Sequence, residues 1–338
     1  MMMLKFSARI LIVIYFRVLD NNIMQKIILV GGSGYLGGRI TEAFLNYGHE
    51  IKILTRNDFF YKNYKARKNL TIIKTNYDSV NLLSQLMKGS DVVMHLASPK
   101  ADSLNELNRK KIIEKHIILT KLVSDAANIS GVSTFIYFST IHVYGQNLKG
   151  VVCEDTTPKP LHPYGIQHLE AEKIILSQKM KSFNAIILRI SNTYGIPYFP
   201  NDYCWKLMVN NFCKEAIENK KIIIKSSGND YRNIISIINL IEFLNFLVEE
   251  KYNFKMNEIF NIGGGETLKI IEVAELIKNK LFSEYDYRVK IDARDDVNDV
   301  HKGHHYFEYS IDKIINKIPF NIENDNKELD NLLHYHLI

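Results

Sequence analysis

Short apolar runs alternate with amphipathic segments from residue 26 onward. Lys26–Val30 (KIILV) is almost entirely apolar and β-branched, which is typical of a strand buried on both faces of a parallel sheet. A glycine-rich turn and an amphipathic segment over Tyr35–Tyr47 follow it, and Gly48 suits the C-terminal end of that helix because glycine adopts left-handed backbone easily. The pattern therefore begins with a strand–turn–helix unit.

The same alternation continues to about residue 190. Helices are expected over Val80–Gly89 and Glu106–Ile129. Further strands are expected at Glu50–Thr55, Leu70–Thr75, Asp91–Ala97, Phe135–Thr140 and Ala185–Ile190. Strands that alternate with helices need crossover connections, so the order predicts an α/β fold with a doubly wound, Rossmann-type parallel sheet.

Less regular patterning after Arg189 indicates a second, smaller C-terminal lobe that holds the substrate. We expect a cofactor-binding Rossmann domain over residues 24–188. Residues 189–338 would be mainly the substrate lobe, with parts returning to the first domain. The apolar run Ile10–Phe16 is too short to span a bilayer, and Met24 stands directly before the first strand. Residues 1–23 are therefore interpreted as a non-native or disordered extension.

The charge balance suits a protein that handles small anions. The 338-residue chain carries a formal net charge of +6, with lysines scattered along its length. Neither a basic stripe nor a nucleic-acid-binding motif is evident, so we expect no nucleic-acid partner and no membrane span. A mild positive excess fits an enzyme that binds phosphates.

Cysteine and histidine usage indicates a reducing, cytoplasmic location and no metal. The three cysteines are odd in number and form no CxxC pair (Cys153, Cys204 and Cys213). The run HKGHH places His301, His304 and His305 together. No cysteine or acidic ligand stands near them at a recognised spacing, so we expect no metal site.

A glycine-rich turn after the first strand predicts a dinucleotide site. Gly31, Gly34 and Gly37 fit G-x-x-G-x-x-G, and Gly32 completes the alternative G-x-G-x-x-G. Glycines at this spacing allow a tight turn and a close approach of backbone to a pyrophosphate, while the helix N-terminus supplies unpaired N–H groups. The strand–turn–helix context makes the motif specific.

The end of the second strand favours NADP over NAD. An NAD site usually has an acidic residue there that binds the ribose 2′-hydroxyl. This chain has Thr55 followed by Arg56, and a guanidinium pairs well with a 2′-phosphate. NADP is the favoured cofactor and NAD the alternative.

Several further motifs occur in a fixed order over Met24–Asp312. They are GGSGYLG, HLAS (His95–Ser98), FSTIHVYG (Phe138–Gly145), Tyr164, LRISNTYG (Leu188–Gly195), the segment Gly228–Arg232 and FNIGGGE (Phe260–Glu266). In this order and spacing the chain resembles the extended short-chain dehydrogenase/reductase family, in particular its NAD(P)-dependent nucleotide-sugar epimerase/dehydratase branch. The resemblance implies a nucleotide-sugar substrate and a homodimer built on two helices per subunit.

The resemblance also implies which residues bind the cofactor. Asn76 stands near the end of the third strand, where the family's aspartate contacts adenine. The full implied set is Gly31, Gly34, Tyr35, Leu36 and Gly37 of the turn, Arg56, Asn76, Leu96, Ala97, Ser98, Tyr164 and His168.

Thr140, Tyr164 and His168 occupy the positions of the family's catalytic residues. There a tyrosinate exchanges a proton with the sugar hydroxyl as hydride moves, and Ser/Thr hydrogen-bonds the reacting oxygen. A lysine four residues after the tyrosine lowers its pKa, which is otherwise near 10. Here histidine replaces that lysine, one helical turn from Tyr164. A protonated imidazole could act similarly, so we expect a working but pH-sensitive site.

A second departure concerns the reaction. In the family's 4,6-dehydratases the threonine is followed by Asp and Glu, which supply acid and base, whereas Thr140 is followed by Ile141 and His142. Isoleucine cannot transfer a proton, so dehydration is not expected. A preference for NADP favours 4-keto reduction of a nucleotide sugar for deoxysugar or surface polysaccharide biosynthesis. The alternatives are a nucleotide-sugar 4-epimerase and a weakly catalytic NADP-binding regulator.

Substrate phosphates are expected to contact the second lobe. By resemblance, Asn192 and Arg232 match positions that bind the nucleotide diphosphate, and Arg294 matches a further arginine. Arginine offers bidentate geometry to phosphate oxygens. Arg294 could equally be a surface charge. His116 stands where many family members have asparagine.

Overall fold

The computed structural model describes residues 24–57, 67–98, 109–178, 184–249, 257–294, 304–318, 322 and 327–337. The expectation for residues 1–23 therefore lies outside the described residues, as does His301. Within the described residues no helix is both long and apolar enough to cross a bilayer.

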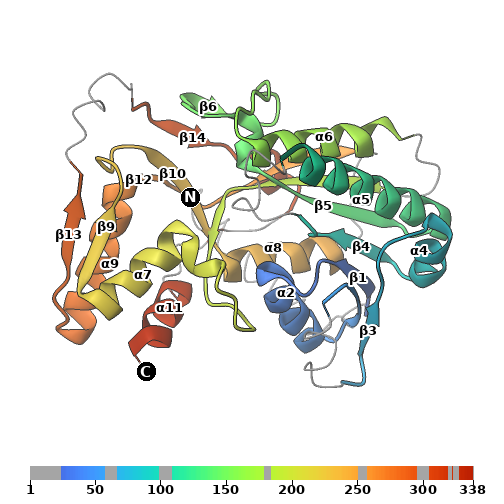
Figure 1. Cartoon of the computed structure of the whole chain (residues 1–338), viewed down its shortest axis with the longest axis horizontal. Helices are drawn as coiled ribbons and strands as arrows, with labels where there is room; N and C mark the ends of the chain where they lie inside the picture. The colour runs from blue at the N-terminus through green and yellow to red at the C-terminus, as the bar shows by residue number, and fades with distance from the viewer. Residues whose placement is uncertain are drawn as a thin grey trace, which may run out of the picture.

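A seven-stranded parallel sheet forms the larger part of the molecule, in the order β11-β7-β5-β4-β1-β2-β3. Four of its strands, β1, β3, β4 and β5, are labelled at the right in Figure 1. Its strands are β1 (Lys26–Val30), β2 (Glu50–Thr55), β3 (Leu70–Lys74), β4 (Val92–His95), β5 (Thr134–Thr140), β7 (Asn184–Ile190) and β11 (Glu258–Ile262). The direction of winding reverses between β1 and β4, where α/β sheets bind ligands. The doubly wound fold is thus confirmed, but the seventh strand, β11, was not recognised from the local pattern.

Helices cover both faces of this sheet, which explains why its strands are apolar without alternation. On one face Ile40 and Phe44 of α2 and Leu240 of α8 pack against Leu29 and Ile53. The other face is covered by α4, α5 and α6. These helices are α2 (Tyr35–Asn46), α8 (Ile237–Glu249), α4 (Val80–Met87), α5 (Arg109–Ser130) and α6 (Pro163–Ser177).

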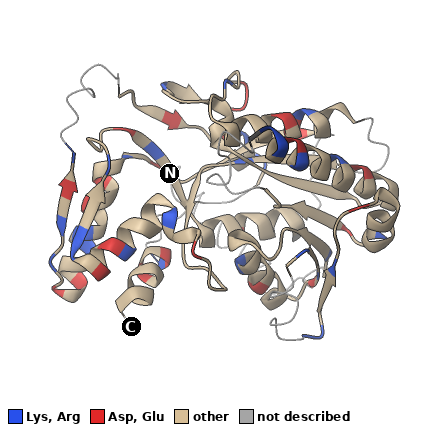
Figure 2. Cartoon of the chain, viewed as in Figure 1, with Lys and Arg blue, Asp and Glu red and all other residues tan. Residues whose placement is uncertain are grey.

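A smaller lobe lies beside the sheet, at the left in Figure 1. Its core joins residues of α7, β9, α9 and α11. Charges of both signs are interspersed over these elements (Figure 2). The lobe and its connections comprise α7 (Met208–Asn219), α9 (Ile270–Tyr285), α11 (Lys327–Leu337), β9 (Lys221–Ile224), β13 (Lys290–Ala293), β8 (Asn192–Tyr194), β10 (Tyr231–Ser236) and β12 (Thr267–Lys269). The remaining short elements are η2 (Ile141–Tyr144), η3 (Cys204–Lys206), β6 (Gly150–Val152), β14 (Phe307–Tyr309) and α10 (Asp312–Ile315).

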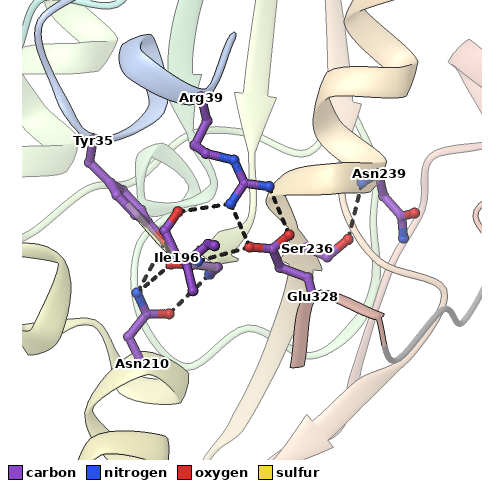
Figure 3. Close-up of polar contacts among 8 residues, drawn as sticks. Tyr35, Arg39, Ile196, Asn210, Ser236, Asn239 and Glu328 are labelled. Atoms are coloured by element: carbon purple, nitrogen blue, oxygen red, sulfur yellow. Dashed lines mark hydrogen bonds and ion pairs between the residues drawn. The ribbon is translucent and has the colours of Figure 1, made fainter. Parts of the chain in front are cut away.

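A buried ion pair fastens the first helix of the Rossmann layer to the C-terminal helix (Figure 3). Arg39 of α2 donates two hydrogen bonds to the carboxylate of Glu328 on α11, at 2.8 and 2.9 Å. The same carboxylate accepts from the backbone N–H of Ile196 at 2.8 Å, and its side chain is fully buried. Because both carboxylate oxygens of Glu328 accept hydrogen bonds, its charge can be buried. The pair fixes the position of α2, the helix that begins at the glycine turn.

Candidate functional site

The glycine turn has the geometry of a pyrophosphate cradle. Gly31 has φ +93°, and a Cβ on it would lie 2.6 Å from the backbone nitrogen of Ala97, so only glycine fits. A Cβ on Gly37 would lie 2.6 Å from the carbonyl oxygen of Gly31. Gly34 is the N-cap of α2 and has no side chain that could accept from the helix's first N–H groups. Those groups and the helix dipole therefore suit an anion.

A cavity of about 620 Å³ opens beside this turn at the winding reversal. Seven residues of the expected cofactor set line it, namely Gly31, Gly34, Arg56, Asn76, Leu96, Ala97 and Ser98. They follow four neighbouring strands, β1 to β4, and meet because carboxyl ends of parallel strands share one edge of the sheet. The shape and the lining fit a dinucleotide.

Arg56 lines this cavity and lies over the ring of Tyr77, 5.8 Å from its centroid. The Thr55 hydroxyl donates to Ser33 Oγ at 3.1 Å and accepts from the backbone N–H of Asn57 at 2.9 Å. Of the described residues that end β2 and follow it, Thr55 to Asn57, none is a carboxylate.

Tyr35, Leu36 and Gly37 form the first turn of α2 rather than the wall of the cavity. The Tyr35 hydroxyl donates to the carbonyl of Gly195 at 2.6 Å and accepts from Asn210 at 3.1 Å. Burial raises the pKa of Tyr35 well above its ordinary value. The Tyr35 side chain thus connects the Rossmann layer to the second lobe (Figure 3). Only the backbone of Tyr35 lies next to the glycine turn.

Tyr164 and His168 lie together near the N-terminus of α6, with ring centroids 4.7 Å apart. The Thr140 hydroxyl, at the end of β5, accepts from the backbone N–H of His142 and so begins η2. The His142 ring then lies edge-on to Tyr164 at 5.9 Å. The rings of His168 and His142 thus contact Tyr164, and Thr140 is linked to this group through the backbone of His142.

The surroundings of His168 correct one expectation. Burial lowers its pKa well below the ordinary value, with neighbouring His116 and His95 acting in the same direction. The imidazole is therefore neutral at pH 7 and cannot act as the cation that replaces lysine. Burial also raises the pKa of Tyr164, so the protein's own groups do not pre-ionise the phenol.

A second cavity, of about 300 Å³, contains two of the expected substrate residues, Asn192 and Arg232. Arg232 is 40% exposed and lies 3.6 Å from Asp230. His142 lines the same cavity, and the positive charge of Arg232 acts to lower its pKa. Arg294 is exposed at the end of β13 and is not among the residues that line this cavity.

The sequence assigned other nearby polar residues no role in cofactor or substrate binding. His304 of the HKGHH run lines the Arg232 cavity, and its Nδ1 lies 2.9 Å from Asp230. Behind His168 lie His95 of the HLAS motif and Tyr137, and the sequence assigned neither of them a role in the site. Among the described residues, no three potential metal ligands gather in one place.

Comparison with known proteins agrees with this geometry. Residues 27–263 match the NAD dependent epimerase/dehydratase family. The chain belongs to this family. It is 28% identical over 270 residues to a protein of Bacillus subtilis named uncharacterized UDP-glucose epimerase YtcB, covering 75% of this chain and 82% of that one. It is also 28% identical over 269 residues to mouse dTDP-D-glucose 4,6-dehydratase, covering 75% and 72%.

Solved structures share the fold. The UDP-glucuronic acid 4-epimerase of Bacillus cereus, solved with UDP-glucuronic acid and NAD, superposes with a TM-score of 0.76 at 22% identity, covering 92% of this chain and 99% of that one. The UDP-N-acetylglucosamine 4-epimerase of the same organism gives 0.70 at 23%, covering 93% and 98%. The chain is thus an enzyme of an NAD-dependent family that acts on nucleotide sugars. These comparisons do not support the preference for NADP suggested by Arg56.

Proposed function

We propose that this protein is an NAD-dependent 4-epimerase of a nucleotide-activated hexose, with Tyr164 as the acid–base group. The observation that carries the proposal is the placement of Tyr164. Its ring contacts both His168 and His142. His168 is hydrogen-bonded to Ser98, which lines the dinucleotide cavity. His142 lines the Arg232 cavity, so Tyr164 lies between the two cavities. A sugar held by its diphosphate at Arg232 would place its ring next to the phenol.

The roles of the residues follow from their chemistry. Bound NAD supplies a hydride acceptor and, when oxidised, a positive charge. Tyr164 removes the proton of the 4-hydroxyl and returns it after the sugar is reduced on its other face. Thr140 donates a hydrogen bond to the reacting oxygen, and Asn192 and Arg232 hold the diphosphate.

Epimerisation is favoured over dehydration by the residues after Thr140. Ile141 is buried and offers no proton, so water cannot be eliminated by the acid–base pair of the dehydratases. The two compared epimerase structures carry uridine nucleotides in their names, so UDP sugars are the first substrates to try.

The test is to purify the protein and incubate it with UDP-glucose, UDP-N-acetylglucosamine and UDP-glucuronic acid without added cofactor. NMR should show the 4-epimer of one of them, and denaturation should release about one NAD per chain. Cofactor retained without conversion of any nucleotide sugar would instead favour the weakly catalytic regulator.

A second candidate, 4-keto reduction with NADPH, is favoured by Arg56 because its guanidinium lines the dinucleotide cavity. The two candidates differ in cofactor use. A reductase consumes added NADPH with a 4-keto sugar, and Arg56→Ala should then raise KM for NADPH about tenfold while leaving NADH unaffected. An epimerase needs no added cofactor, and the same variant should leave its rate within about twofold.

We also propose a homodimer through α5 and α6. These helices lie side by side on one face of the sheet, and α5 exposes Ile118 (57%) and Ile129 (64%). Light scattering should give twice the 39.2 kDa chain mass, and Ile129→Asp, which lies outside the lining of the dinucleotide cavity, should shift it toward the monomer.

A further inference from the structure

A chain of hydrogen bonds behind Tyr164 connects two residues that line the dinucleotide cavity, Ser98 and His116. His168 Nε2 lies 3.0 Å from the Ser98 hydroxyl, and its Nδ1 lies 2.8 Å from the Tyr137 hydroxyl. The same Tyr137 hydroxyl lies 3.1 Å from Nε2 of His116. Tyr137, His116 and His168 are all at most 2% exposed, so the middle of the chain is buried.

Only one arrangement of protons suits this chain. His116 Nδ1 is buried and has no hydrogen-bond partner, and an orphaned N–H is more costly than an orphaned lone pair. The proton of neutral His116 therefore sits on Nε2, which donates to the Tyr137 oxygen. Tyr137 is then free to donate to His168 Nδ1.

The direction of these bonds fixes the proton of His168. Since Nδ1 accepts, the single N–H of the neutral ring is on Nε2 and donates toward Ser98. The Ser98 hydroxyl also accepts a hydrogen bond from the Gln167 amide at 3.2 Å, so it acts as an acceptor in both contacts. The donor end of His168 thus faces the dinucleotide cavity, which Ser98 lines.

No charge competes with this arrangement. The rings that face His168 are those of His116 on α5, Tyr137 on β5 and Tyr164 on its own helix, with His95 of β4 and His142 of η2 acting from further away. Among the described residues that contact its ring, none is a carboxylate. The nearby Glu172 is instead bound by Arg189 at 2.8 Å.

We propose that Tyr137 and His116 are positioning residues that hold His168 as a fixed, neutral Nε2–H donor toward the cofactor side of the site. The protein thereby keeps a hydrogen-bond donor at the position of the family's lysine and gives up the lysine's charge. Tyr164 is then ionised only with help from the oxidised cofactor. The expected effect on kcat rests on the proposed function, whereas the expected tautomer of His168 does not.

The structural test is ¹⁵N NMR of the full-length protein labelled at histidine, with His168→Gln used to assign the signal. The wild-type His168 should show protonated Nε2 and bare Nδ1 from pH 5 to pH 9. Tyr137→Phe removes only the hydroxyl, so the ring should lose its tautomer preference and titrate at higher pH. A wild-type His168 that titrates near pH 6.5, or carries its proton on Nδ1, would overturn the proposal.

The kinetic test uses the same variant. Tyr137→Phe should lower kcat about tenfold, the loss expected for one oriented hydrogen bond, and add an acidic limb to the pH profile that the wild type lacks. His116→Leu should behave alike and His116→Gln, which keeps a donor, should restore activity. Tyr309→Phe is the matched control because its buried hydroxyl donates to the Arg189 carbonyl, away from His168.

The outcomes separate this inference from the proposed function. Wild-type protein that converts no nucleotide sugar refutes the function, while the NMR result still decides the tautomer. An active wild type whose kcat and pH profile are unchanged by both Tyr137→Phe and His116→Leu refutes the positioning role. If Tyr137→Phe does not fold, the kinetics of His116→Leu and His116→Gln and the NMR spectra of the wild type test the positioning role instead.

Discussion

Tyr164 separates two polar regions of opposite character. Behind it lie His95, His116, Tyr137 and His168, all buried and uncharged at neutral pH. In front of it, the cavity of Arg232 is open and carries charges of both signs. The buried region can orient groups because its hydrogen bonds do not compete with water, and the open one can bind an anion at little desolvation cost. In the proposed function, the buried side of the phenol orients groups and the open side binds the substrate.

The largest effect should come from removing the group that joins the two regions. Tyr164→Phe keeps the ring but deletes the acid–base hydroxyl, so kcat should fall about 10³-fold with bound NAD retained. Tyr287→Phe, whose hydroxyl bonds the Ile217 carbonyl in the second lobe, is the control and should stay active. A Tyr164→Phe enzyme within tenfold of wild type would assign the proton transfer to another group.

The buried region should make the protein sensitive to acid. Burial lowers the pKa of His95 to about 3 and that of His116 to about 4, and it lowers the pKa of His168 well below its ordinary value. The unfolded chain binds protons at these histidines near pH 6.5, where the folded chain does not. The free energy of unfolding should therefore be highest above pH 6.5 and fall by about 2 kcal/mol per histidine by pH 5.

Urea denaturation at pH 7 and pH 5 measures this loss. His116→Asn removes one of the buried histidines and should make the decrease smaller. Asparagine at His334, which is exposed on α11, is the control and should leave it unchanged. Equal stability of the wild type at both pH values would show that the buried histidines accept protons in the folded state.

The smallest of these effects should distinguish two arginines of the second lobe. Arg232 lines the substrate cavity, so Arg232→Ala should raise KM for the nucleotide sugar some tens of times, as expected for the loss of a charge-assisted hydrogen bond, with little change in kcat. Arg294 is exposed outside the lining, and Arg294→Ala should leave KM within about twofold. Initial-rate kinetics of the two variants measure both effects, and equal increases in KM would place Arg294 at the substrate.

The amino-acid sequence by itself determined the parts of this protein that depend on neighbouring residues. The apolar runs predicted six of the seven parallel strands within two residues at each end, because helices cover both faces of the sheet and most strand residues are apolar. The glycine spacing predicted the phosphate turn, since Gly31 has left-handed backbone packed against Ala97. Most of the expected cofactor residues line one cavity because they follow neighbouring parallel strands, whose carboxyl ends meet at one edge of the sheet.

The tertiary structure decided what depends on residues far apart in the chain. β11 joins the sheet beside β7 after the chain has passed through the second lobe, so no local pattern marked it as the seventh strand. The position of His168 four residues after Tyr164 did not reveal its charge. That charge depends on His116 of α5 and Tyr137 of β5, which are far from His168 in the sequence. A side chain's pKa depends on burial and on its neighbours in space, and folding alone brings those neighbours together.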